Sequence, residues 1–334
     1  MHFICYNNYM KTSEQIIQIL EKNGSVTAKE LYNSLTINKR AVFKQLANLL
    51  DNGVITKIGK PPKVFYSLSN KPKYIQSTKH TVDSKTRSFV EESFEYITPR
   101  GEKLSGWTGF VVWSGERNLN IDETAERYIK TVKKYDRYKK DGLIDGMYKL
   151  RSSFDNVGLD KMFYLDFYSI EIFGKTKLGQ LLLYAKQSQN RQMINEVADF
   201  AKPQVERLIR KYKIDAVGFI PPTVKRELQF MNQFRERLSL NLKEVNLVKL
   251  KTPITVPQKT LTKIEDRIVN AKETIEVKAE GSFTNILLID DAVGSGSTLN
   301  EVAKKIRLKN LNKGLIVGLA VTGSFKGFEV ISEV

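Results

Sequence analysis

The chain has 334 residues, of which 41% are hydrophobic and 10% aromatic, so it can bury a core and is not a disordered protein. Its formal charge of +17 favours a polyanionic partner, either nucleic acid or a phosphate-rich ligand, although lysine enrichment without a function stays open as a second explanation. One cysteine and two histidines exclude an internal disulfide, a Cys/His zinc site and a Ser–His or Cys–His nucleophile pair.

The N-terminal residues lack the basic and apolar blocks of a signal peptide. No run of 18 apolar residues occurs anywhere in the chain, which argues against a membrane-spanning helix. A single cysteine also suits a reducing compartment. We therefore expect a soluble, cytoplasmic protein that has no membrane partner.

Residues 1–69 show three short helical patterns followed by two strand patterns. Thr27 and Glu30 have the spacing of a capping box, which starts the second of the helices. Strands are expected over residues 54–58 and 64–68, on either side of a Gly-Lys-Pro-Pro turn. Three helices and a hairpin in this order resemble a winged helix-turn-helix, which implies a separate N-terminal DNA-binding domain.

By this resemblance, the third helix enters the major groove and the hairpin touches phosphates. Residues 1–75 carry 11 Lys and Arg but only 4 Asp and Glu, and this excess favours DNA over the alternative, a winged helix used for protein docking or dimerisation. The expected DNA-binding residues are Asn38, Lys39, Arg40, Lys44, Lys57, Lys60 and Lys63.

Residues 70–88 are polar and almost without apolar periodicity, so we expect a linker there. Residues 89–151 read as a small α+β connecting region, with strand-like pieces at 94–97 and 110–113 and a helix over 122–140. Its two tryptophans, Trp107 and Trp113, are expected to lie in a core.

Residues 152–334 alternate between helical and strand patterns, which predicts an α/β domain with a parallel sheet covered by helices. Ligands of such domains bind at the carboxyl ends of the strands. The expected helices span residues 177–211, 224–240 and 298–309, and the expected strands span residues 216–220, 245–250, 286–289 and 315–321.

The segment from residue 285 to 298 carries the clearest chemistry in the chain. Two carboxylates, Asp290 and Asp291, follow an apolar strand, and a Gly-Ser-Gly-Ser turn then lets the backbone approach an anion closely. Thr298 and Glu301 have capping-box spacing, so a helix is expected to start there and point its amides at the same anion. Carboxylates for hydroxyls beside amides for a phosphate describe a sugar-phosphate site.

Other phosphate sites fit this segment less well, because a P-loop needs a lysine where Ser297 stands and a dinucleotide fold needs a glycine where Leu299 stands. The segment resembles the signature of type I phosphoribosyltransferases, although that family often has threonine at the position of Gly294. The resemblance implies that Asp290 and Asp291 hold the ribose hydroxyls. The residues that it places around the 5-phosphate are Ala292, Val293, Gly294, Ser295, Gly296, Ser297 and Thr298.

Two further stretches resemble the ComF subfamily over about 155 residues. One is a strand and proline loop at residues 215–222, followed by basic residues and the pair Asn232–Gln233; the other is the series Gln258, Leu261, Arg267 and Asn270. The resemblance makes residues 251–270 a mobile lid. It also implies pyrophosphate contacts, with Arg226 in a catalytic role, from the residues Pro222, Thr223, Lys225 and Arg226. The cysteine cluster of ComF proteins is absent from this sequence.

These resemblances imply a phosphoribosyl pyrophosphate-binding protein with a DNA-binding winged helix, expected to be a homodimer. It either transfers ribose phosphate or senses the ligand to regulate DNA binding. Mg²⁺ is expected to be held mainly by the ligand, with no dedicated metal-binding residues. Phe325 and Phe328 are candidates to stack on an acceptor base, with packing as the alternative. A different interpretation, a nucleic-acid-handling or host-defence component with a non-catalytic sugar-phosphate pocket, stays open.

Overall fold

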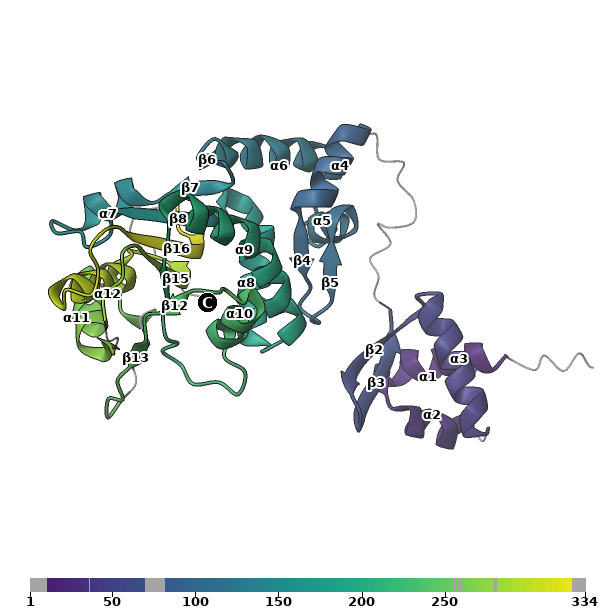
Figure 1. The fold of residues 1–334 in the computed structure, drawn as a ribbon. Helices are drawn as coiled ribbons and strands as arrows, with labels where there is room; N and C mark the ends of the chain where they lie inside the picture. The colour runs from purple at the N-terminus through teal and green to yellow at the C-terminus, as the bar shows by residue number, and fades with distance from the viewer. Residues whose placement is uncertain are drawn as a thin grey trace, which may run out of the picture. The chain divides into compact units, whose positions relative to one another are not determined.

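The computed structural model describes residues 11–35, 37–69, 82–254, 256–257, 260–278 and 281–325. It divides the chain into two compact units, Met1–Lys79 and His80–Val334, which are described separately (Figure 1). Within the described residues, no helix combines the length and the apolar character needed to span a membrane.

The first unit contains a helical layer and a small antiparallel sheet of order β1-β3-β2. Ile16, Leu31, Val42 and Leu46 are buried where the helices meet the sheet. Glu30 accepts the amide of Thr27 at 2.6 Å while its own amide donates to the Thr27 hydroxyl, so the predicted capping box is confirmed. The elements are α1 (Thr12–Asn23), β1 (Ser25–Val26), α2 (Ala28–Leu35), α3 (Lys39–Asp51), β2 (Ile55–Lys60) and β3 (Lys63–Leu68).

The second unit is built on a sheet of order β12-β11-β15-β16-β8-β7-β6. The pairs from β12 to β8 are parallel, whereas β7 and β6 are added antiparallel at one edge. The predicted α/β class with a parallel sheet is therefore confirmed. The strands are β12 (Lys243–Glu244), β11 (Ala216–Phe219), β15 (Ile286–Val293), β16 (Ile316–Gly323), β8 (Lys161–Phe167), β7 (Leu143–Asp145) and β6 (Lys139–Lys140).

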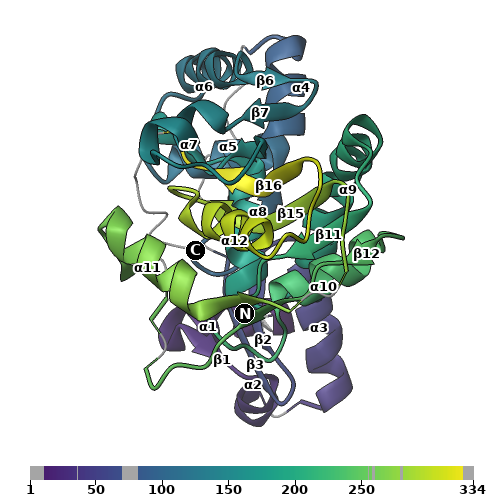
Figure 2. The same ribbon diagram turned by 60° about the vertical axis from the view of Figure 1, so that its left-hand side comes forward.

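Helices cover both faces of this sheet (Figures 1 and 2). Along β15, Leu287 and Ile289 pack into the core made with α8 (Lys177–Gln187), α9 (Arg191–Tyr212) and α10 (Phe230–Leu238). Ile286 and Leu288 pack into the other core, which includes α12 (Ser297–Leu308) and α7 (Met147–Ser153). This alternation explains the unbroken apolar run before Asp290, because a strand buried on both faces needs apolar residues at every position.

Residues 82–136 add an aromatic cluster in which Phe94, Phe110 and Tyr128 meet edge to edge or at a tilt, with ring centroids 5.1–5.7 Å apart. Trp107 and Trp113 are buried in the same cluster, as expected. The elements here are α4 (Ser84–Ser93), β4 (Glu95–Ile97), β5 (Lys103–Ser105), α5 (Gly106–Gly115) and α6 (Ile121–Asp136).

Three expectations for this region are wrong. Residues 110–113 lie in α5 instead of a strand, because burial on nearly all sides of the helix outweighs the strand preference of a Phe-Val-Val-Trp run. The linker ends earlier than residue 88, since Asp83 caps α4 at the amides of Lys85 and Thr86; residues 70–81 lie outside the described part. No boundary falls near residue 151, because β6 and β7 pair into the main sheet.

Sequence patterns also misplaced parts of residues 152–334. Strand β8 was not predicted, and the expected helix over 177–211 is interrupted where Asn190 caps a new helix. The expected strand over 245–250 is not in the parallel sheet, since β13 (Leu247–Lys249) pairs antiparallel with β14 (Ile275–Val277). The remaining elements are β9 (Ser169–Ile170), a 3₁₀ turn (Glu171–Phe173), β10 (Gly174–Lys175) and α11 (Ile264–Thr274).

Candidate functional site

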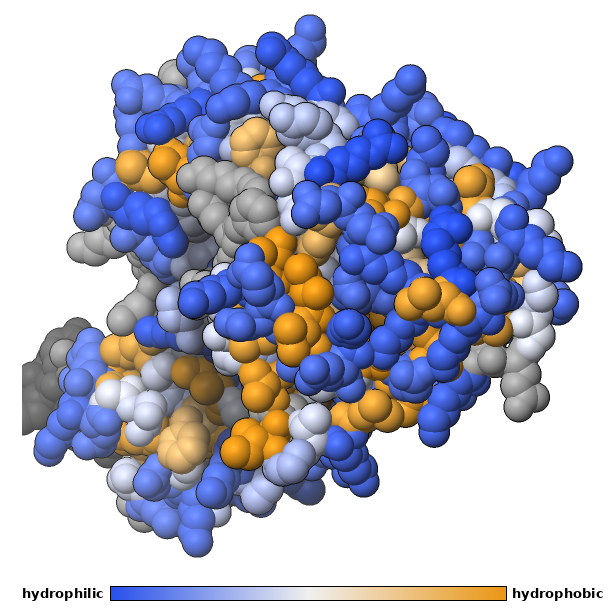
Figure 3. All heavy atoms as spheres, turned by 90° about the vertical axis from the view of Figure 1, so that its left-hand side faces the viewer, coloured by the Kyte–Doolittle hydropathy of each residue, from blue (hydrophilic) through white to orange (hydrophobic). Residues whose placement is uncertain are grey.

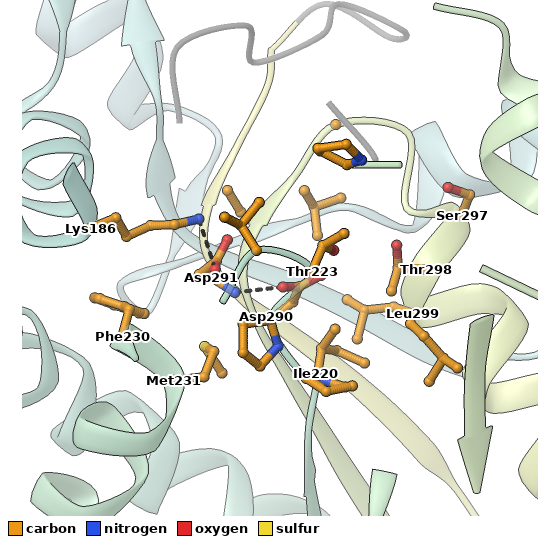
Figure 4. A pocket seen from close by; sticks show the side chains of 18 of the residues that line it. Lys186, Ile220, Thr223, Phe230, Met231, Asp290, Asp291, Ser297, Thr298 and Leu299 are labelled. Atoms are coloured by element: carbon orange, nitrogen blue, oxygen red, sulfur yellow. Dashed lines mark hydrogen bonds and ion pairs between the residues drawn. The ribbon is translucent and has the colours of Figure 1, made fainter. Parts of the chain in front are cut away.

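A cavity of about 200 Å³ opens at the carboxyl ends of β11 and β15, where ligands of parallel sheets bind (Figure 4). One wall is the end of β15 and the chain that follows it, from Asp290 to Leu299, and another is the chain after β11, from Ile220 to Thr223. Lys186 enters from the end of α8, and Phe230 and Met231 come from the start of α10. Polar groups from distant parts of the sequence therefore face one small volume.

The two aspartates have different surroundings. Asp291 forms an ion pair with Lys186, whose Nζ lies 2.8 Å from Oδ2. Asp290 accepts the Asp291 amide at 2.8 Å and has no cation in direct contact among the ion pairs of the described residues. Burial, and secondly the negative charge of Asp291, raise the pKa of Asp290 to about 8. Burial thus favours the protonated form of Asp290, while the Lys186 ammonium lies beside Asp291.

The phosphate loop, residues 294–298, joins β15 to α12 and lines the pocket over its whole length. Gly296 has φ +86°, and a Cβ there would lie 2.5 Å from Cδ1 of Leu150, so a larger residue would strain the backbone and would have to displace the Leu150 side chain. Ser295 and Ser297 are buried, with their hydroxyl oxygens 3.2 Å apart. The first turn of α12 faces the cavity and offers an anion the positive end of the helix.

The expected capping box at Thr298 is wrong. Helix α12 begins one residue earlier, at Ser297, because the left-handed Gly296 takes the cap position. Glu301 instead pairs with Lys304 at 2.8 Å. Thr298 itself remains in the pocket wall, in the first turn of the helix.

Residues 220–229 form a loop where a helix was expected from residue 224, because α10 begins only at Phe230. Pro222, Thr223 and Arg226 line the pocket, whereas Lys225 is exposed and lies outside its lining. Arg226 donates from Nη1 to the carbonyl oxygen of Lys186 at 2.8 Å, so its guanidinium is already engaged with the end of α8.

Arg267 is a pocket residue that the sequence placed only in a family-like series. Its side chain is 6% exposed, it donates from Nε to the carbonyl oxygen of Leu261 at 2.8 Å, and it lines the cavity together with Ser295. Burial lowers the pKa of Arg267, but a guanidinium remains charged. Sequence analysis missed Lys186 altogether, because it lies about 100 residues before the aspartates and only the fold brings it to them.

Other family-like positions do not reach the pocket. Asn232 is exposed, and Gln233 is buried and donates to Asn195 between α10 and α9. Asn270 lies near Lys249 and Thr274, within the arm formed by β13, α11 and β14. Gln258 lies outside the described residues.

The arm of residues 247–277, expected to contain a lid, has exposed apolar side chains. Figure 3 draws the face that carries α11 and α12, where hydrophobic residues appear among hydrophilic ones. The exposed large apolar residues of the arm are Leu250, Ile254, Val256 and Val269. Pro257 and Arg267 bring this arm to the edge of the cavity.

The C-terminal aromatic candidate packs against protein. Phe325 contacts Tyr135, Tyr138 and Phe167 edge to edge, with ring centroids 5.0–5.4 Å apart. It is also absent from the lining of the cavity, so packing is its observed role in the described structure. Phe328 lies outside the described residues.

In the first unit, all seven residues expected to bind DNA are exposed: Asn38, Lys39, Arg40, Lys44, Lys57, Lys60 and Lys63. Asn38 also caps α3, where its Oδ1 accepts the amide of Ala41 at 2.8 Å. Lys39 lies 5.9 Å from the ring centre of the exposed Phe43. One side of α3 and the hairpin thus present cations to solvent.

Comparisons with known proteins reveal only distant structural similarity. No protein-family model and no curated protein sequence matches the chain. Among solved structures, an adenine phosphoribosyltransferase is 14% identical over 44% of this chain and 78% of its own, with a TM-score of 0.28. A hypoxanthine phosphoribosyltransferase from Staphylococcus aureus is 14% identical over 42% of this chain and 80% of its own, with a TM-score of 0.25. The adenine phosphoribosyltransferase of Leishmania tarentolae is 12% identical over 48% of this chain and 90% of its own, with a TM-score of 0.27. Scores this low do not establish a function.

Proposed function

We propose that the pocket binds phosphoribosyl pyrophosphate. The supporting observation is that Asp290, Asp291 and the phosphate loop meet at the end of a single strand and line one cavity. Carboxylates accept hydrogen bonds from ribose hydroxyls, and loop amides at a helix N-terminus bind a phosphate. The 5-phosphate then lies on residues 294–298 and the hydroxyls on the aspartates, which directs C1 and its pyrophosphate towards Pro222 and Thr223.

Transfer of the ribose phosphate would break the bond between C1 and the pyrophosphate oxygen while an acceptor bonds to C1. Positive charge develops at C1 and negative charge on the leaving group, so fixed charges in the pocket contribute most. Asp291 lies on the ribose side, where its charge favours positive charge at C1, and Lys186 lines the same cavity as Pro222 and Thr223 of the proline loop.

We propose that Mg²⁺ enters this site with the ligand and is held mainly by its phosphate oxygens. The described residues contain no group of three His, Cys, Asp or Glu side chains placed to hold a metal ion. Mg²⁺ keeps several waters and binds phosphate oxygens together with one or two carboxylates; here Asp290 would have to lose its proton, and Asp291 would share its charge with Lys186. When bound, it would neutralise charge on the departing pyrophosphate.

Calorimetry with phosphoribosyl pyrophosphate and Mg²⁺ tests this proposal. We expect saturable heat from the wild-type chain and none from the Asp290→Ala, Asp291→Ala double variant. Each lost charge-assisted hydrogen bond weakens binding by about tenfold or more. Equal binding by the two proteins would refute the assignment. Release of pyrophosphate in the presence of a panel of nucleobases then separates a transferase from a protein that only binds the ligand.

We also propose that the first unit is a winged helix that binds DNA, supported by its order of helices and hairpin and by its exposed cations on α3 and the hairpin. Substituting Gln for Lys39, Arg40 and Lys44 should lower the slope of log affinity against log salt by about 3, one for each lost phosphate contact. Lys22 and Lys29, exposed on α1 and α2, are the control substitutions. A slope unchanged by the α3 variants, or a protein that binds no duplex, would contradict DNA binding.

If both proposals hold, the protein can act as a regulator whose DNA binding is controlled by the ligand. In that case phosphoribosyl pyrophosphate changes the affinity of the full chain for DNA, and the Asp290→Ala, Asp291→Ala variant loses this response while keeping its basal DNA affinity. A DNA affinity that is the same with and without saturating ligand would rule out this form of regulation.

A further inference from the structure

The ion pair between Lys186 and Asp291 places an ammonium inside the sugar-phosphate pocket. The Nζ of Lys186 lies 2.8 Å from Oδ2 of Asp291, and the two side chains are only 15% and 19% exposed (Figure 4). Both residues line the cavity. A pair this shielded from water interacts more strongly than a surface pair, and the charge of Lys186 is directed at the ligand volume.

The lysine is held at this position by the neighbouring loop. Arg226 donates to the backbone carbonyl of Lys186 at 2.8 Å, and the side chain of Gln189 accepts the amide of Leu228 at 2.9 Å. These two bonds connect the end of α8 to the loop that carries Pro222 and Thr223. The backbone of Lys186 is therefore tied to this loop, and its ammonium reaches Asp291 inside the cavity that Pro222 and Thr223 also line.

This is the place where a bound sugar pyrophosphate concentrates negative charge next to its ribose hydroxyls. A divalent cation at such a site must approach Asp291 and the pyrophosphate oxygens together. In this chain one oxygen of Asp291 already has a cation beside it. An ammonium with three donors can bond the carboxylate and a pyrophosphate oxygen simultaneously.

We infer that Lys186 is a built-in cation of the pocket, which binds the pyrophosphate group of the ligand and makes binding less dependent on Mg²⁺. This inference rests on the proposed function, because it assigns a role within the same site. Lys186 contacts the ligand directly in this account, and Arg226 acts through Lys186 as a positioning residue.

The test is binding of phosphoribosyl pyrophosphate, measured by calorimetry with Mg²⁺ and again with a chelator in its place. Loss of one charge-assisted contact lowers affinity by about tenfold or more. Removing Mg²⁺ should therefore lower the affinity of Lys186→Met about tenfold or more beyond the fall seen for the wild type. Lys186→Arg retains the charge and should keep a Mg²⁺ dependence close to that of the wild type. Lys103→Met, which removes a surface ion pair with Glu196 outside the pocket, is the matched control.

Two outcomes would overturn the inference while leaving the proposed function intact. One is a ratio of affinities with and without Mg²⁺ that is the same for wild type and Lys186→Met. The other is a Mg²⁺ dependence of Lys186→Arg that matches Lys186→Met, which would show that the shape of the Lys186 side chain matters and its charge does not. Failure of the wild-type chain to bind the ligand under either condition would instead refute the proposed function. The thermal unfolding of each variant is compared with wild type, and Lys186→Gln, which removes the charge but keeps a hydrogen-bonding group, replaces Lys186→Met in the same comparison if Lys186→Met is unstable.

Discussion

Asp290 should destabilise the folded protein near neutral pH, and Asp290→Asn should relieve this cost. Burial and the charge of Asp291 raise the pKa of Asp290 to about 8, whereas an unfolded aspartate titrates near its ordinary value of 3.8. The folded chain thus binds more protons than the unfolded chain between these values. Stability contributed by the protonated carboxyl is present at low pH and is lost as the pH rises through that window.

The size of the effect follows from this difference in proton binding. One pH unit inside the window changes the free energy of unfolding by at most about 1.4 kcal/mol. Asp290 is half-buried and keeps some contact with solvent, so we expect a total of about 1–2 kcal/mol between pH 4 and pH 7. The asparagine of the Asp290→Asn variant cannot ionise, and this variant should therefore be more stable than wild type at pH 7 by that amount and equally stable near pH 4.

Urea denaturation of both proteins at a series of pH values measures this difference directly. Asp291→Asn is the matched comparison, because it removes the partner of Lys186 and should lower stability by about 1 kcal/mol, partly offset by less repulsion on Asp290. If Asp290→Asn shows the same pH dependence as wild type, or is less stable at pH 7, then Asp290 is not held in a charge-penalising site.

Two more predictions concern the phosphate end of the pocket. Gly296→Ala should lower the free energy of unfolding by about 2–5 kcal/mol, because the backbone is left-handed there and the new Cβ meets Leu150. Gly101→Ala is the control and should cost only about 1–2 kcal/mol, since Gly101 has φ +82° but nothing lies within 4 Å of a Cβ. Equal losses in urea denaturation would show that the contact with Leu150 costs nothing. Arg267→Gln should weaken the binding of ribose 5-phosphate by about tenfold or more, because Arg267 is buried in the cavity wall, and should leave the affinity for inorganic pyrophosphate unchanged. If calorimetry finds both affinities lowered equally, Arg267 does not act at the 5-phosphate end of the cavity.

The sequence revealed local features whose signal lies in adjacent residues. The apolar run before Asp290 predicted a strand, and the Gly-Ser turn predicted a close backbone approach at a helix start. The Thr27 capping box is a similar case, since both of its hydrogen bonds form within four residues. In each case the residues that form the sequence pattern are also the residues whose interactions produce the structure.

What the sequence did not predict depends on tertiary contacts. Residues 110–113 have the composition of a strand, yet they form a helix because an aromatic cluster surrounds them. Lys186 has no local feature that distinguishes it from other lysines, and its role depends on α8 ending beside β15. Arg226 reaches the pocket but turns its guanidinium to the end of α8, which its position in a basic loop did not reveal.

In the proposed complex, two aspartates and a glycine-rich turn hold one phosphorylated sugar at the tip of β15. A crystal structure of the chain with phosphoribosyl pyrophosphate tests it most directly. We predict the 5-phosphate within hydrogen-bond distance of the amides of residues 294–298, and the ribose hydroxyls on Asp290 and Asp291. Ligand density away from β15, or a phosphate bound by surface cations while these amides stay bonded to protein, would contradict the account.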